Sequence, residues 1–210
     1  MKIRELLRNE IVQTIILIAI TVVGVAAFWF GLRFAFQTEF PLLAVASGSM
    51  EPTLYRGDLI IVQGVSNFSE LHVGTYKFLN GTLNPNPGEA IVYYDPRYGK
   101  VPVYLPVAGN ARLIVHRAID KQQADNGTWY FTTAGDKYGT KDTWSPFLQD
   151  YIVGRVIGKV PWLGHVPLFL HENRILATSI IVLLFATLII VDFLSSRRED
   201  EKTKVKEEKQ

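Results

Sequence analysis

The sequence of 210 residues contains no cysteine. It therefore has no disulfide, no thiolate ligand for a metal and no cysteine nucleophile. Motifs with metal-ligand spacing, such as His-Glu-x-x-His, are also missing, so we expect neither a metal nor another cofactor. An excess of one charge is lacking too: the formal net charge is +2. Because no long basic stretch crosses the middle of the chain, we expect no nucleic-acid partner.

Hydrophobic residues, which make up 48% of the sequence, gather near its two ends. The first uncharged run extends from Ile11 to about Phe30, and the second, from Ile175 to Leu194, has Asp192 as its only charge. A helix of about 20 residues spans roughly 30 Å, the thickness of the hydrocarbon core of a bilayer. The first run is also longer than the roughly 7–15 residues of a signal-peptide core. We therefore expect two permanent transmembrane helices, with the lipid bilayer as a partner.

Positive charges flank both runs on the side of the chain ends. They precede the first run and follow the second at Lys2, Arg4, Arg8, Arg197, Arg198, Lys202, Lys204, Lys206 and Lys209. By the positive-inside rule, both termini are cytoplasmic and the part between the helices lies outside the cytoplasm. The predicted parts are a cytoplasmic N-terminus (1–10), a transmembrane helix (11–31), an extracytoplasmic domain (32–174), a second transmembrane helix (175–194) and a charged cytoplasmic tail (195–210). We expect the tail to be solvated and partly disordered.

The middle of the chain is predicted to be mainly β. Short segments rich in β-branched and aromatic residues, bounded by Gly, Pro, Asn and Asp, are typical of strands. They cover residues 59–65, 89–95, 111–119, 128–136 and 151–160. No helix of useful length is expected between the two anchors. The predicted fold is an antiparallel, partly barrel-like β domain flanked by two transmembrane helices.

Three segments of this domain carry residues suited to catalysis. Ser-Gly-Ser-Met-Glu-Pro-Thr, from Ser47 to Thr53, has a glycine between two serines, so that the backbone can turn sharply and both hydroxyls can approach one place. His116, in Leu113–Asp120, is a residue that can accept a serine proton at neutral pH. Ala134–Asp142 contains Asp136 and Asp142, and a carboxylate beside an imidazole would hold it in one tautomer.

In this order, the three segments resemble the type I signal peptidases of peptidase family S26, and most closely their archaeal and endoplasmic-reticulum branch. The resemblance extends from about Ile11 to Gly158. It implies a membrane-bound serine endopeptidase that removes N-terminal signal peptides from secreted preproteins. It also implies a multi-pass location in the cell membrane, or in the endoplasmic reticulum membrane if the source is eukaryotic, and an association with the translocation machinery.

The resemblance also implies roles for individual residues. Ser49 is the expected nucleophile and His116 its base, since this branch carries His-Arg where bacterial members carry Lys-Arg. The Ser47 hydroxyl and the Ser49 amide are expected to form the oxyanion hole, and Met50 to line the substrate pocket. Asp142 is favoured as the acid that orients the histidine.

Other parts of the site are less settled by the sequence. Asp136 is expected to shape the site beside Asp142, but the spacing allows either carboxylate to orient the histidine. Lys137 stands where the family often has asparagine. Two other functions stay open: a Ser–Lys peptidase with Lys100 or Lys77 as its base, and a non-catalytic membrane protein whose β domain binds a partner.

The remaining sequence features carry weaker expectations. The histidines outside the three segments, His72, His165 and His171, are interpreted as structural. Residues 41–45 and 160–170 are apolar and adjoin the two helices, and we expect both to rest on the bilayer surface. Asn-x-Ser/Thr triplets that permit glycosylation occur at Asn67, Asn80 and Asn126.

Overall fold

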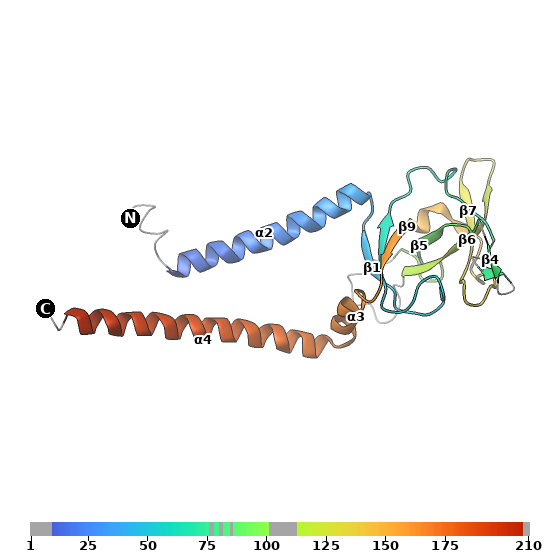
Figure 1. Cartoon of the computed structure of the whole chain (residues 1–210). Coiled ribbons are helices and arrows are strands. Elements are labelled where there is room, and N and C mark those ends of the chain that lie inside the picture. The colour runs from blue at the N-terminus through green and yellow to red at the C-terminus, as the bar shows by residue number, and fades with distance from the viewer. Residues whose placement is uncertain (1–9, 76–77, 80–81, 85, 101–112, 208–210) are drawn as a thin grey trace. The chain divides into compact units, whose positions relative to one another are not determined.

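The computed structural model describes residues 10–75, 78–79, 82–84, 86–100 and 113–207 (Figure 1). It divides into two compact units, Met1–His165 and Val166–Gln210. Lys77, Asn80 and residues 1–9 of the predicted cytoplasmic N-terminus lie outside the described residues. The first unit contains every sequence-predicted site residue.

The centre of the first unit is a seven-stranded, antiparallel sheet that forms an open half-barrel. In spatial order its strands are β1 (Leu42–Ala44), β2 (Leu59–Gln63), β9 (Ile152–Val160), β5 (Ala90–Tyr94), β6 (Leu113–Gln123), β7 (Trp129–Ala134) and β8 (Phe147–Leu148). Figure 1 shows β5, β6 and β7 side by side. The predicted mainly β, antiparallel fold is therefore confirmed.

Strand β9 is the last strand in sequence but lies near the middle of the sheet. It pairs with β2 on one side and with β5 on the other. The half made of β1 and β2 is therefore joined through β9 to the half made of β5, β6, β7 and β8. Gly154 of β9 lies so close to β2 that an added Cβ would be 2.4 Å from the carbonyl oxygen of Gln63. A side chain at this position would disturb the junction.

Both faces of β5 are covered by hydrophobic residues. Val92 belongs to one core cluster with Val45, Met50, Leu54, Ile60 and Val62. Ile91 and Tyr93 belong to a second, with Leu71, Ala118, Phe131 and Phe147. Because successive side chains of a strand point to opposite faces, this alternation gives the sheet two apolar layers. The near-continuous apolar sequence of β5 follows from its burial on both faces.

The register of β5 and β6 brings polar side chains to the second of these faces. His116 is paired with Ile91, and Ile114 with Tyr93. Directly paired residues of an antiparallel ladder project to the same face. His116 and Tyr93 therefore project from one face of the sheet, beside the second core cluster.

The structure adds short elements to those expected from the sequence. It contains β1, β8, a separate hairpin of β3 (Phe78–Leu79) and β4 (Thr82–Leu83), the 3-10 turn η1 (Gln149–Tyr151) and the helix α3 (His165–Glu172). The expectation that the whole segment 41–45 rests on a bilayer surface is wrong. Its central residues form β1, and Pro41 and Val45 are buried because they pack into the domain.

Two long helices correspond to the predicted anchors. Helix α2 (Glu10–Phe36) and helix α4 (Arg174–Glu207) contain stretches, Val12–Phe36 and Arg174–Val191, that are long and apolar enough to cross a membrane. Helix α4 continues through most of the tail that we expected to be partly disordered. The tail sequence is rich in Glu, Lys and Arg, whose high intrinsic helix propensity explains why the helix extends into it.

Candidate active site

Ser49 lies in a tight turn between β1 and β2. The turn is closed by hydrogen bonds from the Glu51 amide to the Gly48 carbonyl (3.2 Å) and from the Leu54 amide to the Met50 carbonyl (2.9 Å). Met50 is fully buried in the first core cluster, and this burial anchors the turn. The structure thus gives Met50 a packing position, and its expected contact with substrate stays a prediction.

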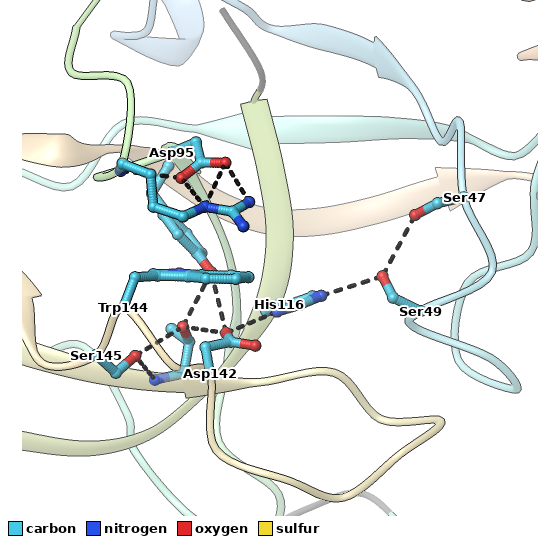
Figure 2. Close-up of polar contacts among 10 residues, drawn as sticks. Ser47, Ser49, Asp95, His116, Asp142, Trp144 and Ser145 are labelled. Carbon is cyan, nitrogen blue, oxygen red and sulfur yellow. Dashed lines mark hydrogen bonds and ion pairs between the residues drawn. The ribbon is translucent and has the colours of Figure 1, made fainter. Parts of the chain in front are cut away.

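The hydroxyl of Ser49 points toward His116, as Figure 2 shows. Ser49 Oγ is 3.1 Å from His116 Nε2, which is hydrogen-bonding distance. Ser47 Oγ lies 3.3 Å from Ser49 Oγ on its other side. Ser47 is exposed, whereas the side chain of His116 is only 11% exposed. The serine therefore stands at the boundary between solvent and a buried base.

Asp142 reaches the opposite end of the histidine ring. Its Oδ2 atom is 2.7 Å from His116 Nδ1, and both side chains are nearly buried. The backbone fixes this position, because the Asp142 amide donates to the Thr133 carbonyl of β7 (2.9 Å). Ser49, His116 and Asp142 thus form one continuous chain of hydrogen bonds (Figure 2).

Two buried hydroxyls also approach the same carboxylate oxygen. Thr133 Oγ1 donates to Asp142 Oδ2 over 2.6 Å, and the Tyr93 hydroxyl donates to it over 3.1 Å. Burial, together with the nearby charge of Asp142, raises the pKa of Tyr93 far above its ordinary value, so this phenol keeps its proton. Both residues are fully buried.

This arrangement determines the tautomer of the histidine. An ionised carboxylate only accepts hydrogen bonds, so His116 must donate to Asp142 from Nδ1. In the neutral ring, Nε2 is then the unprotonated nitrogen and can accept the Ser49 proton. The Tyr93 and Thr133 hydroxyls donate to the same oxygen, so Asp142 Oδ2 acts as the acceptor in all three hydrogen bonds. Neither had been identified from the sequence, because the contact depends on the β5–β6–β7 register.

Asp136 occupies a different position from Asp142. Its two carboxylate oxygens accept from Nε and Nη2 of the buried Arg117, each over 2.6 Å. Thr53, which belongs to the same segment as Ser49, donates to Asp136 as well. Asp136 therefore links the turn that carries Ser49 (called the nucleophile turn below, after the role expected for Ser49) to β6 through Arg117, rather than contacting the histidine ring.

The segment after β7 passes very close to Ser49. A Cβ added to Gly135 would lie 2.7 Å from the carbonyl oxygen of Ser49 and 3.3 Å from His116 Nε2. The Lys137 amide donates to the same Ser49 carbonyl over 3.0 Å. The Lys137 ammonium contacts the Glu51 carboxylate at 2.9 Å, and this hydrogen bond raises the pKa of Lys137. Glu51 thus gives Lys137 a partner on the turn that carries Ser49.

Lys100 and the other histidines lie outside this hydrogen-bonded chain. Lys100 Nζ lies 4.0 Å from Asp150 Oδ2, and Lys100 lines a cavity of about 390 Å³ with Gln37, Thr38, Glu39, Tyr94, Asp150, Ile152 and Val153. His72, His165 and His171 are exposed. The two described glycosylation triplets also begin with exposed residues, Asn67 and Asn126.

Comparison with known proteins gives a consistent set of relatives, although no family model matches the chain. The signal peptidase complex catalytic subunit SEC11 of Tuber melanosporum is 27% identical over 90% of this chain and 95% of its own. The sec11 catalytic subunit of Dictyostelium discoideum is 25% identical, over 91% and 92% of the two chains. The SEC11C catalytic subunit of Canis lupus familiaris is 28% identical, over 80% and 77%. The chain is therefore a homologue of the Ser-His type I signal peptidases of the endoplasmic-reticulum branch.

Proposed function

We propose that this chain is a membrane-bound signal peptidase that removes N-terminal signal peptides from secreted preproteins. The observation that carries the proposal is the chain of hydrogen bonds from Ser49 through His116 to Asp142. A serine is a weak nucleophile until a neighbouring base accepts its proton, and this arrangement supplies that base. The relatives named as signal peptidase complex catalytic subunits support the same reaction.

The proposed reaction begins when Ser49 Oγ attacks the scissile carbonyl carbon while His116 Nε2 takes its proton. The negative charge that develops on the carbonyl oxygen is stabilised by preorganised donors, for which the Ser47 hydroxyl and the Ser49 amide are the candidates. His116 then protonates the departing amine. Water, deprotonated by the same imidazole, finally releases the acyl group from Ser49.

We assign different roles to the two aspartates. Asp142 orients His116 and stabilises the imidazolium that forms during attack, because its carboxylate faces Nδ1. Asp136 holds the nucleophile turn against β6 through Thr53 and Arg117. Asp142→Asn should lower kcat by roughly 10³- to 10⁴-fold without unfolding the protein. Asp136→Asn should act mainly through stability.

The proposal is tested by cleavage of a purified preprotein in proteoliposomes. Ser49→Ala and His116→Ala should each lower the rate by roughly 10⁴-fold or more. Ser66→Ala and His72→Ala change the same residue types at exposed positions and should cleave normally. Cleavage by Ser49→Ala at the wild-type rate would contradict the proposal.

The same variants separate the alternative functions. A Ser–Lys peptidase with Lys100 as base would tolerate His116→Ala and fail with Lys100→Gln. A module that only binds a partner would cut no preprotein, and its binding would be unaffected by Ser49→Ala. If the wild type cleaves only after a membrane extract is added, the chain works as one subunit of a larger assembly, as the names of its relatives suggest.

We further propose that both termini are cytoplasmic and that the β domain lies outside the cytoplasm. The proposal rests on the positive charges beyond each apolar helix. Because the chain has no cysteine, single cysteines can report topology without background. A membrane-impermeant maleimide should label Asp125→Cys, in the turn between β6 and β7, from outside intact cells. It should label Lys209→Cys only after lysis, and the reverse pattern would contradict this orientation.

A further inference from the structure

Trp144, which follows Asp142 in sequence, lies against the histidine of the proposed site. Its ring and the His116 ring are nearly parallel, at 21°, with centroids 6.4 Å apart. This spacing lies within the range over which aromatic rings attract one another. No role for Trp144 follows from the three segments that identified the site.

The histidine needs a neighbour of this kind. Ser49 and Asp142 hold its two nitrogens at opposite ends of the ring. Two such attachments still allow the ring to tilt about the line that joins the nitrogens. A flat group lying parallel to the ring restricts this tilt, and Trp144 supplies one.

Trp144 is itself held at its polar edge. Its Nε1 donates to the Tyr93 hydroxyl over 3.2 Å, and that hydroxyl in turn donates to Asp142. Trp144 is therefore connected to the His116–Asp142 pair twice, once through its ring face and once through Tyr93. A shift of the indole would disturb both partners of the pair.

A cation covers the indole from the side of β5. The guanidinium carbon of Arg97 lies 4.2 Å from the centre of a Trp144 ring, which is close for a cation–π contact. Arg97 Nε and Nη2 pair with the two oxygens of Asp95, over 2.9 and 2.6 Å. In Figure 2, Asp95 lies on one side of the Trp144 ring, and His116 lies beyond the ring toward Ser49. The indole thus has an anchored cation over its ring and the nearly parallel histidine ring as a neighbour.

Burial and charge make this arrangement persistent. The Asp95 side chain is fully buried directly after β5, so it offers a fixed site for the guanidinium. The hydrogen bonds from Arg97 to Asp95 raise the pKa of Arg97 above its ordinary value, so the guanidinium stays charged at every pH at which the protein is folded and assayed. Arg97 is partly exposed, so it lies between the indole and solvent.

We propose that Trp144, clamped by the Asp95–Arg97 pair, is a positioning residue that keeps the His116 ring aligned between Ser49 and Asp142. This inference rests on the proposed peptidase function and adds residues that the three sequence segments do not contain. Trp144 is a neighbour of His116 and not of the reacting bond, so its loss should lower kcat and leave KM nearly unchanged.

The first test compares substitutions in purified, full-length protein in proteoliposomes. Trp144→Ala should lower kcat by roughly 10- to 100-fold, since a displaced catalytic group costs about this much. Trp144→Phe keeps a flat ring but loses the Nε1 donor, and it should recover much of the rate. Arg97→Met removes the cation at similar length and should lower kcat by roughly three- to tenfold.

A matched control exists in the same domain. Trp129 lies in β7 and also carries a cation, Lys121 Nζ, 5.1 Å from its ring centre. Trp129→Ala and Lys121→Met remove an equivalent pair, and any loss of kcat should only follow the loss of folded protein. A Trp144→Ala protein with wild-type melting temperature and wild-type kcat would overturn the proposal.

A second readout does not depend on cleavage. The proton on His116 Nδ1, held by Asp142, should give a far-downfield resonance in ¹H–¹⁵N spectra of the detergent-solubilised protein, identified by its absence in His116→Gln. Trp144→Ala should shift or broaden this resonance, whereas Trp129→Ala should leave it in place. An unchanged resonance in Trp144→Ala would overturn the proposal, whatever the enzyme's activity. Failure of the peptidase proposal would instead show as cleavage that survives Ser49→Ala.

Discussion

At the scale of single residues, one carboxylate oxygen, Asp142 Oδ2, accepts three hydrogen bonds. The donors are the imidazole of His116, the phenol of Tyr93 and the hydroxyl of Thr133. Hydrogen bonds to charged groups contribute about 1.5–3 kcal/mol each, because the low dielectric of the interior strengthens them. Each donor is also buried, so removing the carboxylate would leave donors without a partner. Changes to single atoms here should therefore have large effects.

Tyr93 gives the site a dependence of stability on alkaline pH. The pKa of its phenol is raised by burial, so the folded protein keeps a proton that the unfolded chain releases above about pH 10. The unfolded state then binds fewer protons, and stability falls as pH rises, by up to about 1.4 kcal/mol per pH unit. The melting temperature of the wild type should drop between pH 9 and 11.

Tyr93→Phe should remove this part of the pH dependence, even though the variant starts from lower stability. Tyr138 is mostly exposed, so Tyr138→Phe is the matched control and should melt like the wild type at each pH. Equal slopes for Tyr93→Phe and the wild type would show that another group controls the alkaline transition.

Gly135 is the position where one added methyl group should affect the chemistry directly. Alanine would place its Cβ 2.7 Å from the Ser49 carbonyl oxygen, so the nucleophile turn has to move by a few tenths of an ångström. Gly135→Ala should lower kcat by about 10²-fold, because activity depends steeply on the Ser49–His116 distance. Gly158→Ala, in β9, would meet only side-chain atoms of Ile61 at 3.5 Å or more, which is ordinary contact, and should cleave at the normal rate. A fully active Gly135→Ala would contradict the close fit described here.

At the scale of elements, the buried pair of Arg117 and Asp136 connects β6, the loop after β7 and the nucleophile turn. Removing one partner of such a pair leaves a buried, uncompensated charge and costs about 3–5 kcal/mol. Asp136→Asn should therefore lower the melting temperature by many degrees. Asp150→Asn breaks a long, exposed contact with Lys100 and should change it little. Similar melting temperatures for the two variants would argue against this structural role.

The elements also show which parts of the fold are predictable from sequence. The five longer strands were predicted because β-branched and aromatic residues run between clear turn residues, as in Leu59–Gln63. Strands β1 and β8 have too few residues to establish an alternating pattern, and they form because a neighbouring strand offers pairing. The extension of α4 into the charged tail was missed because low hydrophobicity was read as disorder.

The candidate site, like the fold, was only partly predictable from the sequence. Its serine, histidine and aspartates stand in short segments of recognisable order. Tyr93, Thr133 and Trp144 have no such local signal. Their positions around His116 and Asp142 depend on strand register and on the turn that brings Lys141 back beside Ala134. The spacing alone could not tell Asp136 from Asp142 for the same reason.

At the scale of the whole molecule, we expect the end of the β domain to contact lipid. Trp162 is 77% exposed and Leu163 50% exposed, and they lie between β9 and helix α3 in sequence. Trp162 has a positive φ of 67°, which is uncommon for a bulky residue. Exposed tryptophan and leucine shortly before an apolar helix in sequence are typical of residues at a membrane interface.

A nitroxide attached at Leu163→Cys tests this expectation in proteoliposomes. Its relaxation should respond more to oxygen, which concentrates in lipid, than to a water-soluble nickel complex. The same label at Asp125→Cys, in the exposed β6–β7 turn, should show the opposite preference. Equal accessibility profiles at the two sites would mean that Leu163 faces water.

The position of β9 has a consequence for the order of events during synthesis. The ribosome makes the strand that joins the Ser49 half of the sheet to the His116 half after every other strand. A nascent chain that ends before about residue 160 therefore carries all three residues of the triad but no completed sheet to hold them together. The protease should remain inactive until the whole domain has left the ribosome and folded. Helix α2, which is made before the β domain, therefore does not meet its own chain in an active state during synthesis.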